Sequence, residues 1–212
     1  MMSLRKTHSV SGLYAITPDE LDTAKLVRKV DLALSGGAQT IQYRNKIANL
    51  ELRIEQANEL RKLTERFSVP LIINDDAVLA HQVDANGVHL GGDDGSIADA
   101  RAIMGSDKLI GVSCYNRMEL AHEAVLNGAD YVAFGSFFAS TVKPDAVLVG
   151  LELLHQARRE IAVPLVAIGG ITVERGGQLL DAGANALAVI SAVFDATDIQ
   201  AAARRFSALN YS

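Results

Sequence analysis

Acidic and basic side chains stand close together at several places in this sequence, and their spacing suggests phosphate chemistry. Arg44 and Lys46 are two positions apart, which would send both cations the same way from an extended strand. Asp75 and Asp94 supply carboxylates in two later segments. Mg²⁺ in proteins typically takes one or two carboxylates, several waters and the oxygens of a substrate phosphate. These residues predict a site where Mg²⁺ and two cations together neutralise a leaving diphosphate.

Hydroxyl groups and a third cation occur in the second half of the chain. Ser113 and Ser140 could donate hydrogen bonds to phosphate oxygens, and Lys143 could reach a diphosphate as a point charge. Ser113 lacks the flanking glycines of a Gly-x-Ser-x-Gly turn, so the sequence gives little support for a nucleophilic serine. The second half therefore adds hydrogen-bond donors to the predicted diphosphate site.

Each of these residues also has an ordinary structural explanation. Arg44 and Lys46 could be surface charges at a solvated strand end. Asp75 and Asp94 could cap the helices that follow them. The joint occurrence of both kinds of charge favours a Mg²⁺-diphosphate site. His89 lies inside an apolar run, where hydrogen-bonded core and a functional role both stay open.

The elements that must position these residues follow a repeated strand–helix pattern. Short runs rich in Val, Ile, Leu and Tyr predict strands over residues 12–18, 40–44, 70–74, 87–91, 109–114, 130–136, 164–170 and 186–194. Segments with helical periodicity separate them, for example residues 21–34, 49–67 and 118–126. Eight such units predict a (β/α)₈ barrel. A doubly wound sheet is the alternative, but no Gly-x-Gly-x-x-Gly turn follows the first strand.

In such a barrel the polar residues would lie together at one end. Active sites of this fold lie at the carboxyl ends of the strands, and the loops after strands seven and eight often hold a phosphate through backbone N–H groups. Gly169 and Gly170 end the seventh run, and Ile190 and Ser191 lie in the eighth. The two glycines could instead serve only a tight turn. A separate monophosphate site implies two phosphorylated substrates.

Composition excludes several classes of protein. The chain has 212 residues, 49% hydrophobic and 21% charged, which suits one barrel domain over residues 1–212 with a short flexible N-terminus of about ten residues. The net charge of −5 has no basic cluster, which argues against nucleic acid and anionic membrane as partners. No apolar run approaches the roughly 18 residues of a membrane span, so we expect a cytoplasmic protein. Cys114 is the only cysteine, which excludes an intrachain disulfide.

Five motifs in order carry a family resemblance. They are Gln42-x-Arg44-x-Lys46, Asn74-Asp75, Gly87-Val88-His89-Leu90-Gly91, Gly111-Val112-Ser113 and Ala167-Ile168-Gly169-Gly170-Ile171. From about residue 13 to residue 194 the chain resembles the thiamine-phosphate synthases. The resemblance implies a transferase that joins 4-amino-5-hydroxymethyl-2-methylpyrimidine diphosphate to 4-methyl-5-(β-hydroxyethyl)thiazole phosphate, with one Mg²⁺ per subunit. The sequence leaves open whether the enzyme is a homodimer.

The resemblance also assigns roles to residues. It implies that the pyrimidine diphosphate is held by Gln42, Arg44, Lys46, Asn74, Ser113, Ser140, Val142 and Lys143. Of these, Arg44, Lys46, Ser113 and Lys143 would stabilise the departing diphosphate. Asp75 and Asp94 would ligate Mg²⁺. The thiazole phosphate would be bound by Gly170, Ile190 and Ser191, largely through backbone N–H groups. The implied mechanism is dissociative, with diphosphate leaving before the thiazole nitrogen attacks.

Three positions depart from the family pattern. Asn45 stands where Glu is usual, Gly92 where Gln is usual, and Val142 where the family has a hydroxyl residue. The competing interpretations are a thiazole-phosphate tautomerase, a phosphosugar isomerase or epimerase, and a non-catalytic phosphometabolite-binding barrel. The tautomerase and the isomerase would not need the full set of basic and acidic residues, and the intact set argues against a barrel that has lost turnover.

Restoring the family's hydroxyl at Val142 tests the loop that carries Lys143. A hydrogen bond to a charged group is worth about 1.5–3 kcal/mol. We therefore expect Val142→Thr to leave the rate of thiamine phosphate formation equal or higher. A severe loss of rate would show that this loop is not arranged as in the family.

Overall fold

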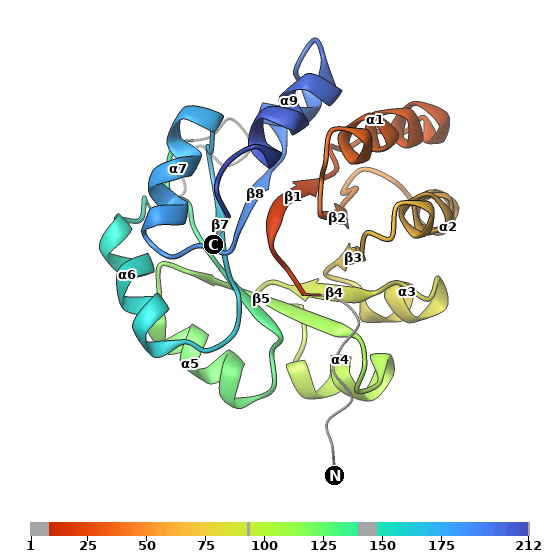
Figure 1. The fold of residues 1–212 in the computed structure, drawn as a ribbon. Coiled ribbons are helices and arrows are strands. Elements are labelled where there is room, and N and C mark those ends of the chain that lie inside the picture. The colour runs from red at the N-terminus through yellow and green to blue at the C-terminus, as the bar shows by residue number, and fades with distance from the viewer. Residues whose placement is uncertain (1–8, 93, 140–147, 212) are drawn as a thin grey trace.

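The computed structural model describes residues 9–92, 94–139 and 148–211, and its strands form a closed parallel barrel surrounded by helices (Figure 1). The strands are β1 (Gly12–Ile16), β2 (Thr40–Tyr43), β3 (Leu71–Asn74), β4 (Gly87–Leu90), β5 (Leu109–Tyr115), β6 (Tyr131–Phe134), β7 (Leu165–Ile168) and β8 (Ala186–Val189). Each pairs in parallel with the next, and β8 pairs with β1. The predicted (β/α)₈ barrel is confirmed.

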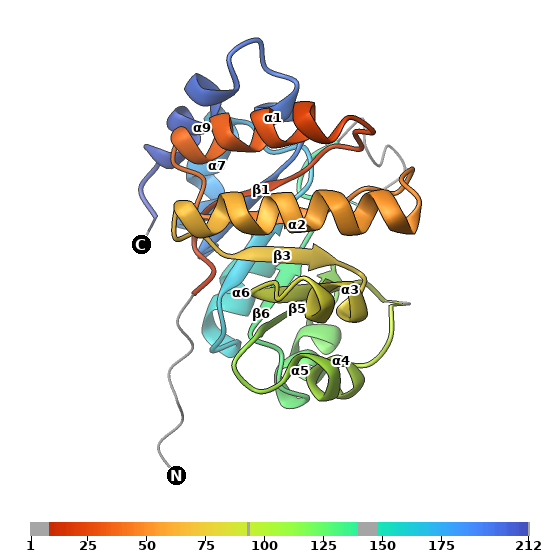
Figure 2. The same ribbon diagram turned by 90° about the vertical axis from the view of Figure 1, so that its right-hand side faces the viewer.

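Helices follow the strands and cover the outside of the barrel. They are α1 (Thr23–Ser35), α2 (Leu50–Arg66), α3 (Ala77–Gln82), α4 (Ile97–Met104), α5 (Met118–Leu126), α6 (Leu151–Glu160), α7 (Val173–Asp181), α8 (Ser191–Phe194) and α9 (Ile199–Ser207). Figure 2 shows α1 and α2 lying alongside each other on the outer surface. In the described part of the chain, we find no helix with the length and apolar character that a membrane span needs.

The last predicted strand was wrong in its second half. We predicted a strand over residues 186–194, but β8 ends at Val189 and the chain turns into the short helix α8. Val193 and Phe194 are buried in that helix. An apolar run of this length cannot distinguish a buried strand from a strand followed by a buried helical turn. The predicted N-terminal flexibility falls mostly on residues 1–8, outside the described residues.

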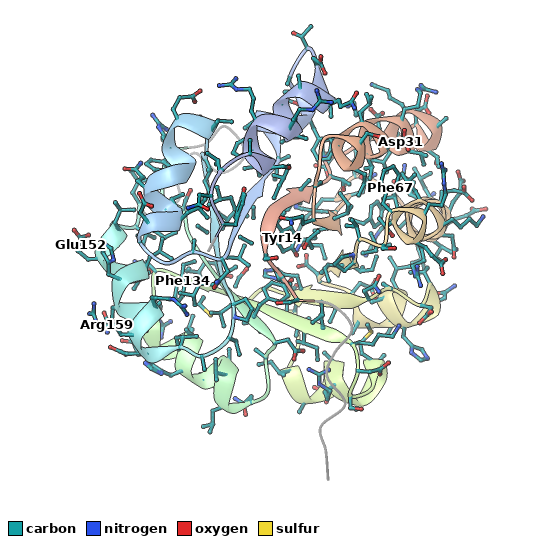
Figure 3. The ribbon with its side chains drawn as sticks, in the orientation of Figure 1. Tyr14, Asp31, Phe67, Phe134, Glu152 and Arg159 are labelled. Atoms are coloured by element: carbon teal, nitrogen blue, oxygen red, sulfur yellow. The ribbon has the colours of Figure 1, made fainter. Side chains whose placement is uncertain are left out.

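Alternation along the strands builds two separate apolar layers. Leu13 and Ala15 face outward into the large core between strands and helices, whereas Tyr14 and Ile16 face into the barrel. Figure 3 shows Tyr14 near the centre of the ring of strands. The inner cluster also includes Tyr131 and Val166. The barrel interior is therefore packed by side chains and is no open pore.

Gly111 on β5 makes room for the inward-facing ring of Tyr131. A Cβ atom at this position would lie 1.9 Å from Cζ of Tyr131, the residue it pairs with on β6. No side chain can replace hydrogen there without moving the ring or the strand. The glycine of the Gly111-Val112-Ser113 motif therefore has a packing role.

Substitution of Gly111 tests this packing. We expect Gly111→Ala to lower the free energy of unfolding by about 1–3 kcal/mol, because overpacking forces side chains and backbone to shift. Urea denaturation measures the change. Gly177→Ala is the matched control, because a Cβ atom there meets nothing within 4 Å and Ala is favoured over Gly inside a helix. Equal stability of the two variants would show that the Tyr131 ring does not need this space.

Candidate active site

The predicted site residues that the structure describes meet at the carboxyl end of the barrel, around two adjoining cavities. One cavity, of about 520 Å³, is lined by Lys46, Asp75 and Asp94. The other, of about 540 Å³, is lined by Gln42, His89, Ser113, Gly170, Ile190 and Ser191. Arg44 and Asn74 line both. Ser140, Val142 and Lys143 lie outside the described residues.

The two cations of the β2 motif are held by a residue that the sequence analysis did not single out. Oδ1 of Asp19 accepts a hydrogen bond from Nη1 of Arg44 at 3.3 Å and another from the backbone N–H of Lys46 at 2.7 Å. Nζ of Lys46 donates to Oδ2 of Asp75 at 3.0 Å. Lys46 follows the end of β2 at Tyr43, so the loop and Asp19 position it, and strand alternation does not. Only the place of Asp19 just beyond β1 could have indicated its role.

Asp75 and Asp94 do not cap helices, which rules out their ordinary explanation. Asp76 is the N-cap of α3, and its Oδ1 accepts from Leu79 N–H at 2.8 Å. Ser96 is the N-cap of α4. Asp75 has a backbone φ of +66°, in the left-handed region that residues other than glycine rarely adopt. Both carboxylates line the first cavity, where Asp75 accepts from Lys46 and Oδ2 of Asp94 accepts from the backbone N–H of Gly91 at 2.8 Å.

Burial and the neighbouring Asp75 carboxyl both affect the ionisation of Asp94. Loss of solvent raises the pKa of Asp94, and the neighbouring Asp75 carboxyl raises it further, while Lys46 opposes the change. Like charges in one site disfavour ionisation unless a cation lies near them. No cluster of three or more His, Cys, Asp or Glu side chains suited to a metal occurs within residues 9–92, 94–139 and 148–211. Asp75 and Asp94, the two predicted ligands, form a carboxylate pair of the kind that Mg²⁺ takes together with water and the oxygens of a substrate phosphate.

His89 lies at the base of the second cavity and is almost completely buried, with 8% of its surface exposed. Burial lowers the pKa of His89 to about 4, so the ring is neutral near pH 7. Its Nε2 lies 2.9 Å from Oγ of Ser113, and its Nδ1 lies 3.1 Å from the hydroxyl of Tyr131. His89 is thus a buried, hydrogen-bonded residue, which is one of the two roles that the sequence left open. It also contacts Ser113, a predicted site residue.

Backbone geometry at β7 and β8 suits close approach of a ligand. Gly169 and Gly170 have φ values of +104° and +59°, and a Cβ at Gly170 would lie 2.3 Å from the carbonyl oxygen of Ala139. The glycines are thus required by the turn itself. α8 begins at Ser191, directly after Ile190. Free N–H groups at a helix start and a glycine turn are common phosphate ligands.

The departures from the family pattern have structural partners where the structure describes them. Nδ2 of Asn45 donates to the carbonyl of Glu20 at 2.7 Å and to Oε1 of Gln56 at 3.0 Å. Its Oδ1 accepts from the backbone of the loop that follows β2. The backbone N–H of Gly92 donates to the Tyr115 hydroxyl at 3.1 Å. Asn45 therefore holds the loop that carries Lys46.

The sequence matches a known protein family. The model of the family described as thiamine monophosphate synthase matches residues 13–193, which is most of the chain. The chain belongs to the thiamine monophosphate synthase family. The resemblance stated from the motifs is confirmed. The enzyme is accordingly a transferase of thiamine biosynthesis.

Individual relatives are similar to this chain over nearly its whole length. The thiamine-phosphate synthase of Methylobacillus flagellatus is 53% identical over 200 residues, covering 94% of this chain and 95% of the relative. That of Nitrosospira multiformis is 52% identical over 200 residues, covering 94% and 86%. The structure of thiamine phosphate pyrophosphorylase from Pyrococcus furiosus is 38% identical with a TM-score of 0.84, covering 92% of this chain and 93% of that chain.

Substitution of Asp19 tests whether it positions the two cations. We expect Asp19→Ala to lower kcat/KM for thiamine phosphate synthesis about tenfold, because a hydrogen bond to a charged group is lost. Asp19→Asn is the matched control, since it keeps an amide oxygen that can accept the same hydrogen bonds and should lose less. Steady-state kinetics measure both. Unchanged kinetics in Asp19→Ala would mean that Arg44 and Lys46 reach their working positions without it.

Proposed function

We propose that this enzyme joins 4-amino-5-hydroxymethyl-2-methylpyrimidine diphosphate to 4-methyl-5-(β-hydroxyethyl)thiazole phosphate, giving thiamine phosphate and diphosphate. One observation carries most of the proposal. The cavity with Lys46, Asp75 and Asp94 adjoins the larger cavity below the glycine turn, and Arg44 lines both. A diphosphate in the first cavity would therefore lie next to organic rings in the second.

Mg²⁺ is part of the proposal, with one ion per subunit held by Asp75 and Asp94. The carboxylate pair supports this assignment, because Asp75 raises the pKa of Asp94 and neither residue caps a helix. When bound, Mg²⁺ would add positive charge that stabilises the departing diphosphate. Nζ of Lys46 lies 3.0 Å from Oδ2 of Asp75, so the ion would share this carboxylate with Lys46 or replace it there.

Different residues of the protein would bind different parts of the two substrates. Arg44 and Lys46, with Ser140, Val142 and Lys143 from the loop outside the described residues, would bind the diphosphate. Gln42 and Asn74 would hold the pyrimidine end of the same substrate, and Ser113 would donate a hydrogen bond to its diphosphate. Gly170, Ile190 and Ser191 would bind the thiazole phosphate through backbone N–H groups. The described members of this set line the two cavities, with Arg44 and Asn74 lining both, which supports the division.

The proposed mechanism is dissociative. Diphosphate leaves first, the amino group on the pyrimidine ring stabilises the resulting methyl cation, and the thiazole nitrogen captures it. The enzyme must stabilise charge on the leaving group and hold the nitrogen close, so no protein nucleophile is required. Ile16, Val166 and Ile168 supply apolar walls to the second cavity. Such walls would limit the access of water to a reactive cation.

Location and assembly complete the proposal. We propose that the whole chain forms one barrel domain that works in the cytoplasm, where its small phosphorylated substrates would be available. A homodimer is compatible with the proposed reaction. Analytical ultracentrifugation of the purified enzyme decides the assembly.

Omission experiments test the reaction. Purified enzyme is incubated with Mg²⁺, the pyrimidine diphosphate and the thiazole phosphate, each left out in turn, and diphosphate and thiamine phosphate are measured. Equal amounts of both products, formed only in the complete mixture, would establish the synthase reaction. Conversion of the thiazole phosphate alone would indicate a tautomerase. Binding of the thiazole phosphate without any product would indicate a non-catalytic barrel.

Asp94→Ala tests the metal assignment. Outer-shell partners of metal ligands are already worth about 10–100-fold in affinity or activity, so loss of a ligand should lower Mg²⁺-dependent turnover by about 100-fold or more. Asp107→Ala is the matched control, because Asp107 is an exposed aspartate just before β5, at the opposite end of the barrel. Full activity of Asp94→Ala at saturating Mg²⁺ would exclude Asp94 as a ligand.

A further inference from the structure

A chain of hydrogen bonds crosses the barrel interior beneath the proposed site. Nε2 of Gln42 donates to the Tyr14 hydroxyl at 2.9 Å, and the Tyr14 and Tyr131 hydroxyls are 2.9 Å apart. The Tyr131 hydroxyl lies 3.1 Å from Nδ1 of His89, and Nε2 of His89 lies 2.9 Å from Oγ of Ser113. We call these five side chains the relay. It joins two residues that line the proposed substrate cavity, Gln42 and Ser113, through two tyrosines and a histidine.

The members of the relay are held rigidly. The rings of Tyr14 and Tyr131 meet edge to face with centroids 6.1 Å apart, and His89 stacks on Tyr131 at 5.5 Å. Tyr14 and Tyr131 are 1% and 0% exposed. Gly111 supplies the space for the Tyr131 ring. Five different strands, β1, β2, β4, β5 and β6, contribute one side chain each. The spacing of the relay is therefore set by the barrel itself.

The number of available protons decides which group donates and which accepts in each hydrogen bond of the relay. We call this order of donors and acceptors its direction. Burial raises the pKa of both tyrosines, so each hydroxyl keeps its single proton. Tyr14 accepts from the amide of Gln42, which leaves its own proton for Tyr131. Tyr131 must then donate to Nδ1 of His89. A neutral His89 that accepts at Nδ1 carries its proton on Nε2 and donates it to Ser113.

We propose that the relay presents Ser113 as a hydrogen-bond donor and Gln42 as an acceptor to the substrate, with Tyr14, Tyr131 and His89 as positioning residues. Since Ser113 accepts from His89, its own proton is free for an anionic oxygen. Since Gln42 uses Nε2 on Tyr14, its Oε1 is left for a donor. These roles match a diphosphate oxygen and a ring amino group, and in this respect the inference rests on the proposed function.

The opposite direction of the relay would fit the substrate poorly. It requires a rotated Gln42 amide, a proton on Nδ1 of His89 and a Ser113 hydroxyl that donates to Nε2. Gln42 would then present N–H groups to the amino group, and Ser113 would have no proton left for the phosphate. The two directions differ in one observable, which is the nitrogen of His89 that carries the proton.

Nitrogen NMR of the histidine rings reads this observable directly in the intact enzyme. The spectrum of ¹⁵N-histidine-labelled protein is recorded near pH 7, and the His89 signals are assigned by their loss in His89→Asn. We expect the proton on Nε2 in the wild type and a shift towards a mixture of the two tautomers in Tyr131→Phe. A proton on Nδ1 in the wild type would overturn the proposal, whatever reaction the enzyme catalyses.

A double-mutant cycle tests the link to substrate binding. We expect Tyr131→Phe and Ser113→Ala each to lower kcat/KM for the pyrimidine diphosphate about tenfold. Because Tyr131 acts through Ser113, adding Tyr131→Phe to Ser113→Ala should cost less than about twofold more. Tyr211→Phe is the matched control, since the hydroxyl that it removes donates, within residues 9–92, 94–139 and 148–211, only to the backbone carbonyl of Phe206 in α9.

The outcomes separate the two proposals. Losses that multiply in the double mutant, in a wild type that makes thiamine phosphate, would overturn the relay and leave the proposed function standing. A wild type that fails the omission experiments would overturn the proposed function, while the NMR result still decides the direction of the relay. Urea denaturation of Tyr131→Phe establishes that the variant is folded at the assay temperature.

Discussion

Pairing between β1 and β8 closes the barrel, and the rest of the structure depends on this closure. Gly12 pairs with Ala186 and Ala15 with Val189, so the sheet has no free edge. Closure sends every second side chain of every strand into one narrow interior. Apolar residues such as Ile72 fill part of that space. The polar residues near the strand ends must then meet one another or a ligand.

Buried polar groups in such an interior need partners. An unpaired donor or acceptor away from water costs about 1–3 kcal/mol. Among the described residues, Thr40 Oγ1 is the one fully buried side-chain oxygen or nitrogen without a hydrogen-bond partner. The interior of this barrel is therefore both apolar and hydrogen-bonded. Gln42, Tyr14, Tyr131 and His89 satisfy one another, which fixes their orientation before any substrate arrives.

At the rim, where water is present, the charges are balanced within the protein. Asp19 pairs with Arg44, and Asp75 pairs with Lys46. The Lys46 and Asp75 side chains are 57% and 27% exposed, and exposed pairs of this kind are worth only about 0.2–1 kcal/mol. A diphosphate could therefore replace Asp75 as the partner of Lys46 at little cost, which would leave Asp75 free for a cation. The hydrogen-bonded side chains inside the barrel can orient a substrate, and the weak ion pairs at the rim can open to let it bind.

The sequence alone determined the succession of strands and helices and the residue types at the strand ends, because apolar periodicity and composition are local properties. It therefore predicted that Arg44, Asp75 and Ser113 would share one end of the barrel. It misjudged residues 186–194, where one apolar run serves both β8 and α8. Only the tertiary structure paired Asp19 with Arg44, 25 residues away, and Tyr14 with Tyr131, 117 residues away. Such contacts depend on how the closed barrel aligns distant strands, and no local pattern records that alignment.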